Sequence, residues 1–129
     1  MQLLWIALGG ATGALCRFGI GKAMTSLNPH PRFSVGILAA NLIGCFLMGA
    51  LFILISNLDA GPREALTAFV LTGFLGSLTT YSTYMLEFVS LAQDGVHKHA
   101  LGYIGVHFVG GVIALGAGLK LALVFQGSR

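Results

Sequence analysis

The residues that could do chemistry gather in one run, from Gly73 to Glu87. It reads Gly-Phe-Leu-Gly-Ser-Leu-Thr-Thr-Tyr-Ser-Thr-Tyr-Met-Leu-Glu. Two glycines, a series of hydroxyl-bearing side chains and a carboxylate stand inside a stretch that is otherwise apolar. Polar groups at membrane depth are costly, so they usually line a pathway or an interface instead of facing lipid. The run therefore predicts a polar path or contact surface inside the protein.

The spacing along this run places polar side chains on two adjoining stripes of a helix. Thr80, Thr83 and Glu87 stand at i, i+3 and i+7, and therefore share one face. Tyr81 and Tyr84 follow a neighbouring stripe. Hydroxyl groups can donate to an anion or accept from a proton or a cation. The electropositive edge of an aromatic ring can line an anion path without holding the ion tightly; an interfacial aromatic belt is the alternative, but both tyrosines stand too far inside the segment for it.

Four polar residues in the apolar segments each allow more than one role. Glu87 fits a proton carrier, a hydrogen-bonding partner or a residue near a pore mouth, and its place towards the segment's end favours the last. Asn41 could coordinate a passing anion, although a link between helices is the simpler role for a lone amide. Arg17 fits a counter-charge for an anion or a side chain that reaches the interface. His107 fits a titrating group or a donor that links helices, which we favour.

The glycines of the run predict a local weakness in the helix. Gly73, Gly76 and Ser77 are poor helix formers at a point that would be in mid-membrane. A break would free backbone carbonyl groups, which must then be satisfied by protein, water or an ion. Such carbonyls are hard oxygen ligands that suit a cation such as Na⁺. An unbroken helix with glycines for close packing is an equally good interpretation of these residues.

The elements that hold these residues are expected to be membrane helices. The chain has 129 residues, of which 56% are hydrophobic and 9% charged, and its mean hydropathy is +0.87. Soluble domains carry roughly a quarter charged residues. Four apolar segments, at residues 3–27, 33–58, 65–93 and 100–125, each reach the length of about 20 residues that spans a bilayer. We predict an all-α membrane protein with a single domain of four transmembrane helices.

The charges favour neither orientation of these four helices. Three basic residues fall on the side that holds the termini and three on the other; they are Arg63, Lys120 and Arg129 on the first side, and Lys22, Arg32 and Lys98 on the second. A chain without a positive-inside bias can insert both ways, so two copies could pair as an antiparallel homodimer. The scattered charges exclude a nucleic-acid surface. Cys16 and Cys45 are expected to be small buried residues without a disulfide or a metal.

Small residues recur at spacings that let helix backbones approach each other. They fall at Gly9, Gly10 and Gly13, at Gly44 and Gly49, and at Gly105, Gly110, Gly111, Gly116 and Gly118. The pattern predicts dense packing, but it does not say which helices touch.

Four stretches of the chain, taken in order, resemble one known family. They are residues 9–18 (Gly-Gly-Ala-Thr-Gly-Ala-Leu-Cys-Arg-Phe), 36–44 (Gly-Ile-Leu-Ala-Ala-Asn-Leu-Ile-Gly), 73–84 with Glu87, and 106–111 (Val-His-Phe-Val-Gly-Gly). Together they resemble the Fluc, or CrcB, fluoride channels of bacteria. The motif at 73–84 is highly specific, whereas the glycine patterns alone would be weak.

The resemblance implies an antiparallel, dual-topology homodimer with two pores and a third helix broken in mid-membrane. It implies a structural Na⁺ at the centre of the dimer, held by the backbone carbonyls of Gly76 and Thr79. The pore-lining residues that it implies are Asn41, Tyr81, Ser82, Thr83, Tyr84 and Glu87. In the family the two aromatic positions are usually phenylalanine, a second glycine stands where this chain has Ser77, and some members carry a hydroxyl where it has Ala114 and Leu115.

The function we expect is a fluoride-selective channel in the bacterial inner membrane that exports fluoride passively from the cytoplasm and so lowers its toxicity. No ATP-binding motif, nucleophile–base pair or metal cluster in the sequence suggests an enzyme. The alternative is a proton-coupled exporter of the small multidrug type. Such exporters place a carboxylate in the first helix, where this chain has Arg17. The expected partners are fluoride, a second copy of the chain and membrane lipid.

Overall fold

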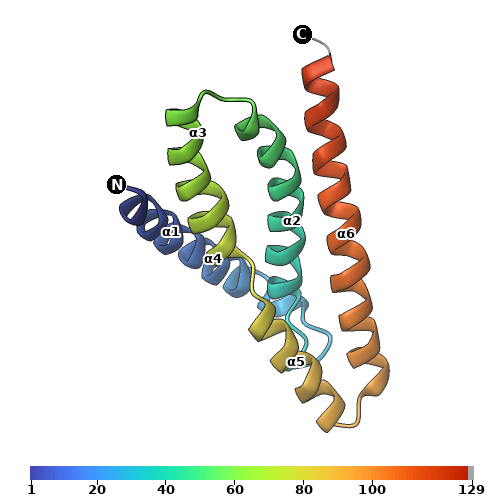
Figure 1. The fold of residues 1–129 in the computed structure, drawn as a ribbon. Helices are drawn as coiled ribbons and strands as arrows, with labels where there is room; N and C mark the ends of the chain where they lie inside the picture. Colours follow the sequence, from blue (N-terminus) through green and yellow to red (C-terminus); the bar gives the residue numbers. More distant parts are fainter. Residues whose placement is uncertain (128–129) are drawn as a thin grey trace.

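The computed structural model describes residues 1–127, and it is helical almost throughout. Within that range, four segments are long and apolar enough to cross a membrane. They are α1 (Gln2–Ala23), α2 (Val35–Ser56), a composite third span (Ala60–Gln93) and α6 (His97–Gly127) (Figure 1). A short 3₁₀ turn, η1 (Thr25–Leu27), follows α1. The expectation of an all-helical protein with four membrane-spanning segments is confirmed.

The third span is built from four pieces. These are α3 (Ala60–Leu66), the π-helix η2 (Thr67–Leu75), α4 (Gly76–Leu78) and α5 (Tyr81–Gln93). Between α4 and α5, Thr79 and Thr80 have extended backbone, with ψ angles of 152° and 119°. The chain changes direction there, as Figure 1 shows in the yellow segment. The span is therefore interrupted.

The interruption does not lie at the glycines, where the sequence had placed the weakness. Gly73 stays inside η2, and Gly76 keeps helical angles of φ −63° and ψ −30°. A Cβ added at Gly73 would lie 2.7 Å from the carbonyl oxygen of Ile6 in α1. Gly73 thus serves close packing, and the predicted position of the break is wrong by a few residues. The helix ends instead just before Thr80, whose backbone forms hydrogen bonds with the Asn41 side chain.

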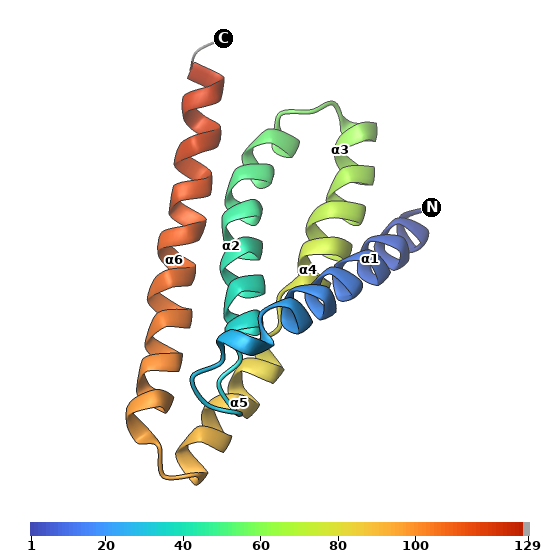
Figure 2. The same ribbon diagram turned by 180° about the vertical axis from the view of Figure 1, so that it is seen from behind.

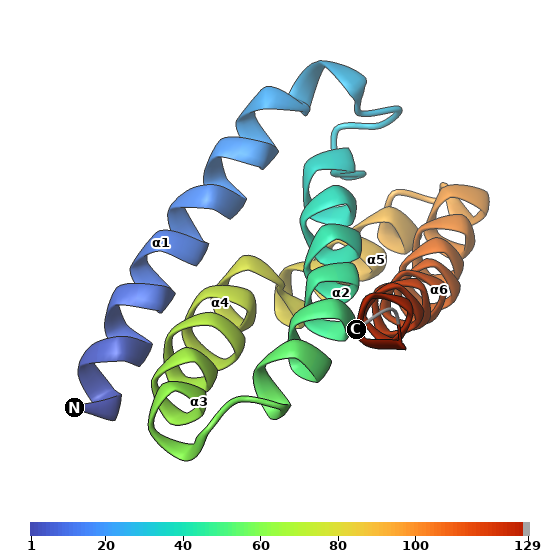
Figure 3. The same cartoon turned by 90° about the horizontal axis from the view of Figure 1, so that it is seen from above.

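Glycines bring two pairs of helices into backbone contact. In α1, a Cβ at Gly9 or Gly13 would overlap backbone atoms of η2. In α2 and α6, a Cβ at Gly49 or Gly118 would overlap backbone atoms of the facing helix. Seen from above, α1 lies along α3 and η2, while α2 stands between that pair and α6 (Figure 3). The glycines that the sequence left unassigned thus join α1 to the third span and α2 to α6.

Buried side chains form two clusters, one on each side of the interruption. One cluster contains Ala40, Leu75 and Leu78. The other contains Tyr84, Leu91, Ala100 and Tyr103, between α5 and α6. Many large apolar side chains remain exposed on the outside, among them Leu15, Phe18, Phe108 and Ile113. Such a surface suits lipid or another protein rather than water.

Different connections of the chain lie at the two ends of the molecule. The C-terminal end of α6 and the α2–α3 connection lie at one end, and the connections that follow α1 and α5 lie at the other (Figure 2). At the latter end Arg32 and Asp94 form an ion pair at 2.7 Å, which joins the two connections. Arg129, which the sequence assigned to the opposite end, lies outside the described residues.

The two cysteines differ in their surroundings. Cys16 is exposed on α1, so the expectation that it is buried is wrong for the single chain, whereas Cys45 is partly buried. Both thiols are free. Among residues 1–127, no group of three His, Cys, Asp or Glu side chains could hold a metal ion.

Candidate functional site

One side chain, that of Asn41, forms hydrogen bonds with the backbone at the interruption in the third span. The Asn41 oxygen accepts a hydrogen bond from the Thr80 amide at 2.8 Å, and the Asn41 amide nitrogen donates to the Thr80 carbonyl at 3.3 Å. Thr80 in turn is the N-cap of α5, because its hydroxyl oxygen accepts from the Thr83 amide at 3.3 Å. Asn41 therefore satisfies the Thr80 amide, for which the helix provides no partner, and adds a second donor to the Thr80 carbonyl, which as the N-cap carbonyl also accepts the first hydrogen bond of α5.

The interruption leaves the last four carbonyl groups of the preceding helical stretch without their helical donors. In a continuous helix, the amides of Thr80 and Thr83 would pair with the carbonyls of Gly76 and Thr79. Here the Thr80 amide donates to Asn41, and the Thr83 amide donates to the Thr80 hydroxyl. The interruption thus frees the carbonyls of Gly76, Ser77, Leu78 and Thr79 from their helical donors. Gly76 and Thr79, to which the family resemblance assigns a cation, are two of these four.

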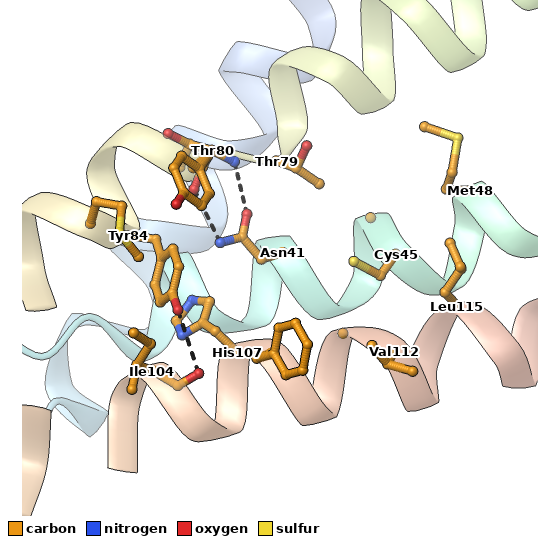
Figure 4. Close-up of a pocket in the computed structure, with 15 residues that line it drawn as sticks. Asn41, Cys45, Met48, Thr79, Thr80, Tyr84, Ile104, His107, Val112 and Leu115 are labelled. Carbon is orange, nitrogen blue, oxygen red and sulfur yellow. Dashed lines mark hydrogen bonds between the residues drawn. The ribbon is translucent and has the colours of Figure 1, made fainter. Parts of the chain in front are cut away.

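A groove of about 840 Å³ opens beside the interruption, between α2, α5 and α6. Its walls are largely apolar, with a few polar side chains among them (Figure 4). The lining residues are Asn41, Gly44, Cys45, Met48, Thr79, Thr80, Tyr81, Tyr84, Met85, Ile104, His107, Phe108, Gly111, Val112 and Leu115. A mostly apolar hollow with a few convergent polar groups is the usual form of a binding site.

The two tyrosines of the motif occupy different positions in this groove. Tyr84 is buried, and its ring stacks on His107 with centroids 4.4 Å apart. Tyr81 has 75% of its surface exposed and meets Tyr84 edge-on, with ring centroids 5.8 Å apart. Tyr84 thus forms a wall of the groove, whereas Tyr81 stands at its open side.

The remaining predicted residues do not line this groove. Ser82 is exposed, and Thr83 is half-buried and accepts a hydrogen bond from the Thr80 hydroxyl at 3.1 Å. Glu87 is half-buried and accepts a hydrogen bond from the Tyr103 hydroxyl. Of the six residues predicted for the pore, the structure gathers Asn41, Tyr81 and Tyr84 around the groove.

Tyr103 was missed as a partner of Glu87. Its side chain is fully buried between Phe33, Tyr84 and His107, and not at an interfacial aromatic belt. A signal was present in the chain: the short connection after Gln93 makes α5 and α6 antiparallel neighbours, and Glu87 and Tyr103 stand at similar distances from it.

Three of the hydroxyl groups in the groove wall, those of Thr79, Thr80 and Tyr84, are already used as donors within the protein. Thr79 donates to the Leu75 carbonyl at 3.0 Å, and Thr80 donates to the Thr83 hydroxyl at 3.1 Å. The Tyr84 hydroxyl donates to the Ile104 carbonyl at 3.5 Å. A ligand in the groove must therefore find other donors, among them the second N–H of the Asn41 amide, since only one of the two is used by Thr80.

His107 does not link helices by a hydrogen bond in the way that the sequence suggested. Its Nδ1 lies 3.0 Å from the carbonyl oxygen of Tyr103, one turn earlier in α6. Its Nε2 is buried and has no hydrogen-bonding partner among residues 1–127. The residue contacts α5 through its ring, by stacking on Tyr84. Arg17, the other ambiguous charge, is half-buried in α1 and lies outside the groove lining.

Comparison with known proteins identifies relatives along nearly the whole chain. The family model described as "CrcB-like protein, Camphor Resistance (CrcB)" matches residues 4–119. A protein of Salinibacter ruber named "Fluoride-specific ion channel FluC" is 44% identical over 126 residues, which cover 96% of this chain and 92% of the relative. A Pseudomonas putida protein of the same name is 40% identical over 116 residues, covering 90% and 92%. An Acidobacterium capsulatum protein of that name is 39% identical over 120 residues, covering 92% and 94%.

Proposed function

The chain belongs to the CrcB family, and from this premise we propose that it is a fluoride-selective ion channel. The observation that carries the proposal is the likeness, over nearly the whole chain, to relatives named as fluoride-specific channels. The protein is a multi-pass membrane protein of the bacterial inner membrane, and it lets fluoride leave the cytoplasm down its gradient. Ion channels are not enzymes, and the comparisons give no support to the alternative of a proton-coupled exporter.

The main physical problem for such a channel is to remove water from fluoride. Fluoride holds water strongly, so a path must offer groups that replace it. The free N–H of Asn41 and the ring edges of Tyr81 and Tyr84 meet this need in the groove. None of the lining side chains carries a fixed positive charge, so an anion would not be held too tightly to pass.

A second copy of the chain would complete the path. The groove is open on one side, where Tyr81 stands with most of its surface exposed. Ser82 is also exposed there, beyond the groove's own wall. We infer that the chain forms an antiparallel homodimer, since its basic residues favour neither orientation. The partner would then cover Tyr81, enclose the groove and bring Ser82, Thr83 and Glu87 into the same polar path.

A structural Na⁺ between the two copies fits the freed carbonyls. Gly76 is exposed and Thr79 half-buried, so their carbonyl oxygens can face a neighbouring copy. Backbone carbonyls are hard oxygen donors of the kind that Na⁺ accepts. Bound there, Na⁺ would hold the interrupted ends of both third spans together.

Fluoride efflux from liposomes tests the proposed function. Liposomes that hold the purified protein and a fluoride gradient should release fluoride when an ionophore balances the charge. Liposomes with a chloride gradient should not release chloride. Protein-free liposomes measure the leak of hydrogen fluoride through lipid. Fluoride release that does not exceed this leak, or equal release of chloride, contradicts the proposal.

Labelling of introduced cysteines tests the orientation. In a Cys-free background, a cysteine placed in the α2–α3 connection should be labelled from both sides of the membrane, and two lysines added to that connection should bias the labelling to one side. A single orientation for the unmodified charges contradicts the antiparallel dimer.

Substitutions at the freed carbonyls test the cation. Gly76→Val should weaken Na⁺-dependent stability because the branched side chain adds bulk on the exposed side of the helix, beside the carbonyl that would hold the ion. Thr79→Ser should be tolerated, since only its carbonyl is used. Equal Na⁺ dependence in both variants and the unmodified protein counts against this site.

A further inference from the structure

One nitrogen in the groove has no role in the path proposed above. His107 Nε2 is buried without a partner among residues 1–127, and the side chain as a whole has 9% of its surface exposed. His107 belongs to the groove wall, beside Tyr84 and within the same lining as Asn41 (Figure 4). A buried polar atom without a partner is costly, so such an atom in a binding groove points to a ligand.

The other ring nitrogen fixes what Nε2 can do. The Tyr103 carbonyl can only accept, so Nδ1, 3.0 Å from it, carries the hydrogen. In the neutral ring Nε2 is then a bare acceptor, which repels an anion. In the protonated ring Nε2 becomes a donor. His107 therefore presents either an acceptor or a donor to the groove, and a single proton decides which.

The need for donors in the groove favours the protonated form when an anion is present. The hydroxyls of Thr79, Thr80 and Tyr84 already donate to protein acceptors. The Asn41 amide has one N–H left. Apart from the Tyr81 hydroxyl at the open side, a small anion that has lost its water would thus find few donors in the groove unless His107 supplies one.

We propose that His107 binds a proton at Nε2 when a small anion enters the groove, and that Nε2–H then donates a hydrogen bond to that anion. The proposal rests on the proposed function, which makes the anion fluoride. The proton comes from water when the anion binds. When the anion leaves, the proton returns to water and the neutral ring is restored. His107 is thus an anion ligand whose strength depends on pH.

The groups around His107 include one carboxylate, that of Glu87, which contacts Tyr103 and not His107 itself. From α5, Tyr84 stacks on the ring, and the Glu87 carboxylate accepts from Tyr103, which itself meets His107 edge-on. From α2, the titratable side chain in the groove wall is Cys45. The lining holds no lysine or arginine. A proton on His107 would therefore meet the Glu87 carboxylate, through Tyr103, and no fixed positive charge in the groove wall.

Flux measurements at two pH values test the proposal. The unmodified protein should pass fluoride about tenfold faster at pH 6 than at pH 8, after subtraction of the lipid leak, because the lower pH favours the protonated ring that adds a charge-assisted hydrogen bond to the anion. His107→Gln, whose amide donates at every pH, should conduct with a rate that does not follow pH. His99→Gln, an exposed histidine of α6 away from the groove, is the matched control and should keep the unmodified pH profile.

A direct measurement covers the case in which His107→Gln fails to fold. In unmodified protein labelled with ¹⁵N-histidine, added fluoride should raise the pH at which the His107 signal titrates, and added chloride should not. No change on adding fluoride, or equal pH profiles in the His107→Gln and unmodified proteins, overturns the proposal. The absence of fluoride flux from the unmodified protein at both pH values would instead overturn the proposed function.

Discussion

The two halves of the third span are held in place by different means. The first half, from Ala60 to Leu78, lies against α1, where glycines such as Gly9 and Gly13 bring the backbones into contact. The second half, α5, lies against α6, where Tyr84 and Tyr103 stand between the helices with His107. The first half packs closely because the facing glycines have no side chains, whereas the second half packs through large aromatic rings.

The difference explains where the groove lies. Two backbones in contact leave no room for a ligand, whereas rings hold helices further apart and carry polar groups into the gap. The first half therefore acts as a scaffold and the second as the wall of a site. Asn41 joins the two, because it holds the Thr80 backbone at the point where one half ends and the other begins.

The largest effect is expected where the halves meet. Asn41→Ala leaves the Thr80 amide without a partner, at about 1–3 kcal/mol, and removes one of the donors to the Thr80 carbonyl. We expect lower thermal stability in detergent and fluoride flux in liposomes slowed by at least about tenfold, the equivalent of one lost hydrogen bond to an ion. Asn41→Asp keeps an acceptor for the Thr80 amide and should recover part of the stability but not the flux. Full flux in Asn41→Ala would mean that the path lies elsewhere.

A methyl group added to α1 where it contacts the scaffold half should destabilise the fold. At Gly13 a new Cβ would lie 2.9 Å from the carbonyl carbon of Phe74, so Gly13→Ala should cost about 1–3 kcal/mol of unfolding free energy, as overpacking does. Gly19→Ala is the matched control on the same helix, since a Cβ there meets nothing within 4 Å. Thermal unfolding of both variants in detergent measures the difference. Equal unfolding temperatures would contradict the close contact.

A smaller loss of stability is expected where the site half, α5, contacts α6. Tyr103→Phe keeps the ring between α5 and α6 but removes the hydrogen bond to Glu87, and we expect a loss of about 1 kcal/mol in unfolding free energy. Glu87→Gln leaves an acceptor for the Tyr103 hydroxyl and should cost less. Combining the two changes should add nothing beyond the loss in Tyr103→Phe, if the two side chains act through their shared bond. Fully additive losses would show that they act separately.

The smallest effect is expected from the tyrosine hydroxyls. Tyr81→Phe and Tyr84→Phe leave the ring edges unchanged, so fluoride flux should stay within about twofold of the unmodified rate. Loss of flux in both variants would show that the hydroxyls coordinate the ion instead. Tyr81→Ile removes the ring and is the informative companion, because normal flux in that variant would place the path away from Tyr81.

Hydropathy predicted the four spans because lipid requires long apolar segments, and that requirement can be seen in the sequence of each segment alone. The resemblance carried by residues 73–84 likewise identified the family, which the comparisons confirm. These features depend on local patterns of residue type.

The position of the interruption could not be predicted because it depends on a contact across the fold. Asn41 and Thr80 are separated by 39 residues, and nothing in the local sequence shows that α2 brings the amide to this point. The partner of Glu87 escaped prediction for the same reason. The glycines led to a wrong prediction. Gly73 was expected to weaken the helix, but it is a point of close contact with α1.

The unequal ends of the molecule have an electrical consequence. Among residues 1–127, the end that holds the Arg32–Asp94 pair also holds Lys22, Lys98 and three histidines, whereas the other end holds Arg63 and Lys120 together with the acidic Asp59 and Glu64. A positive mouth concentrates anions near it, so a single orientation would pass current more readily in one direction than in the other. An antiparallel pair presents one such end to each face of the membrane. The current–voltage relation of the pair should therefore be symmetric, although the charges of each single chain are distributed unequally between its two ends.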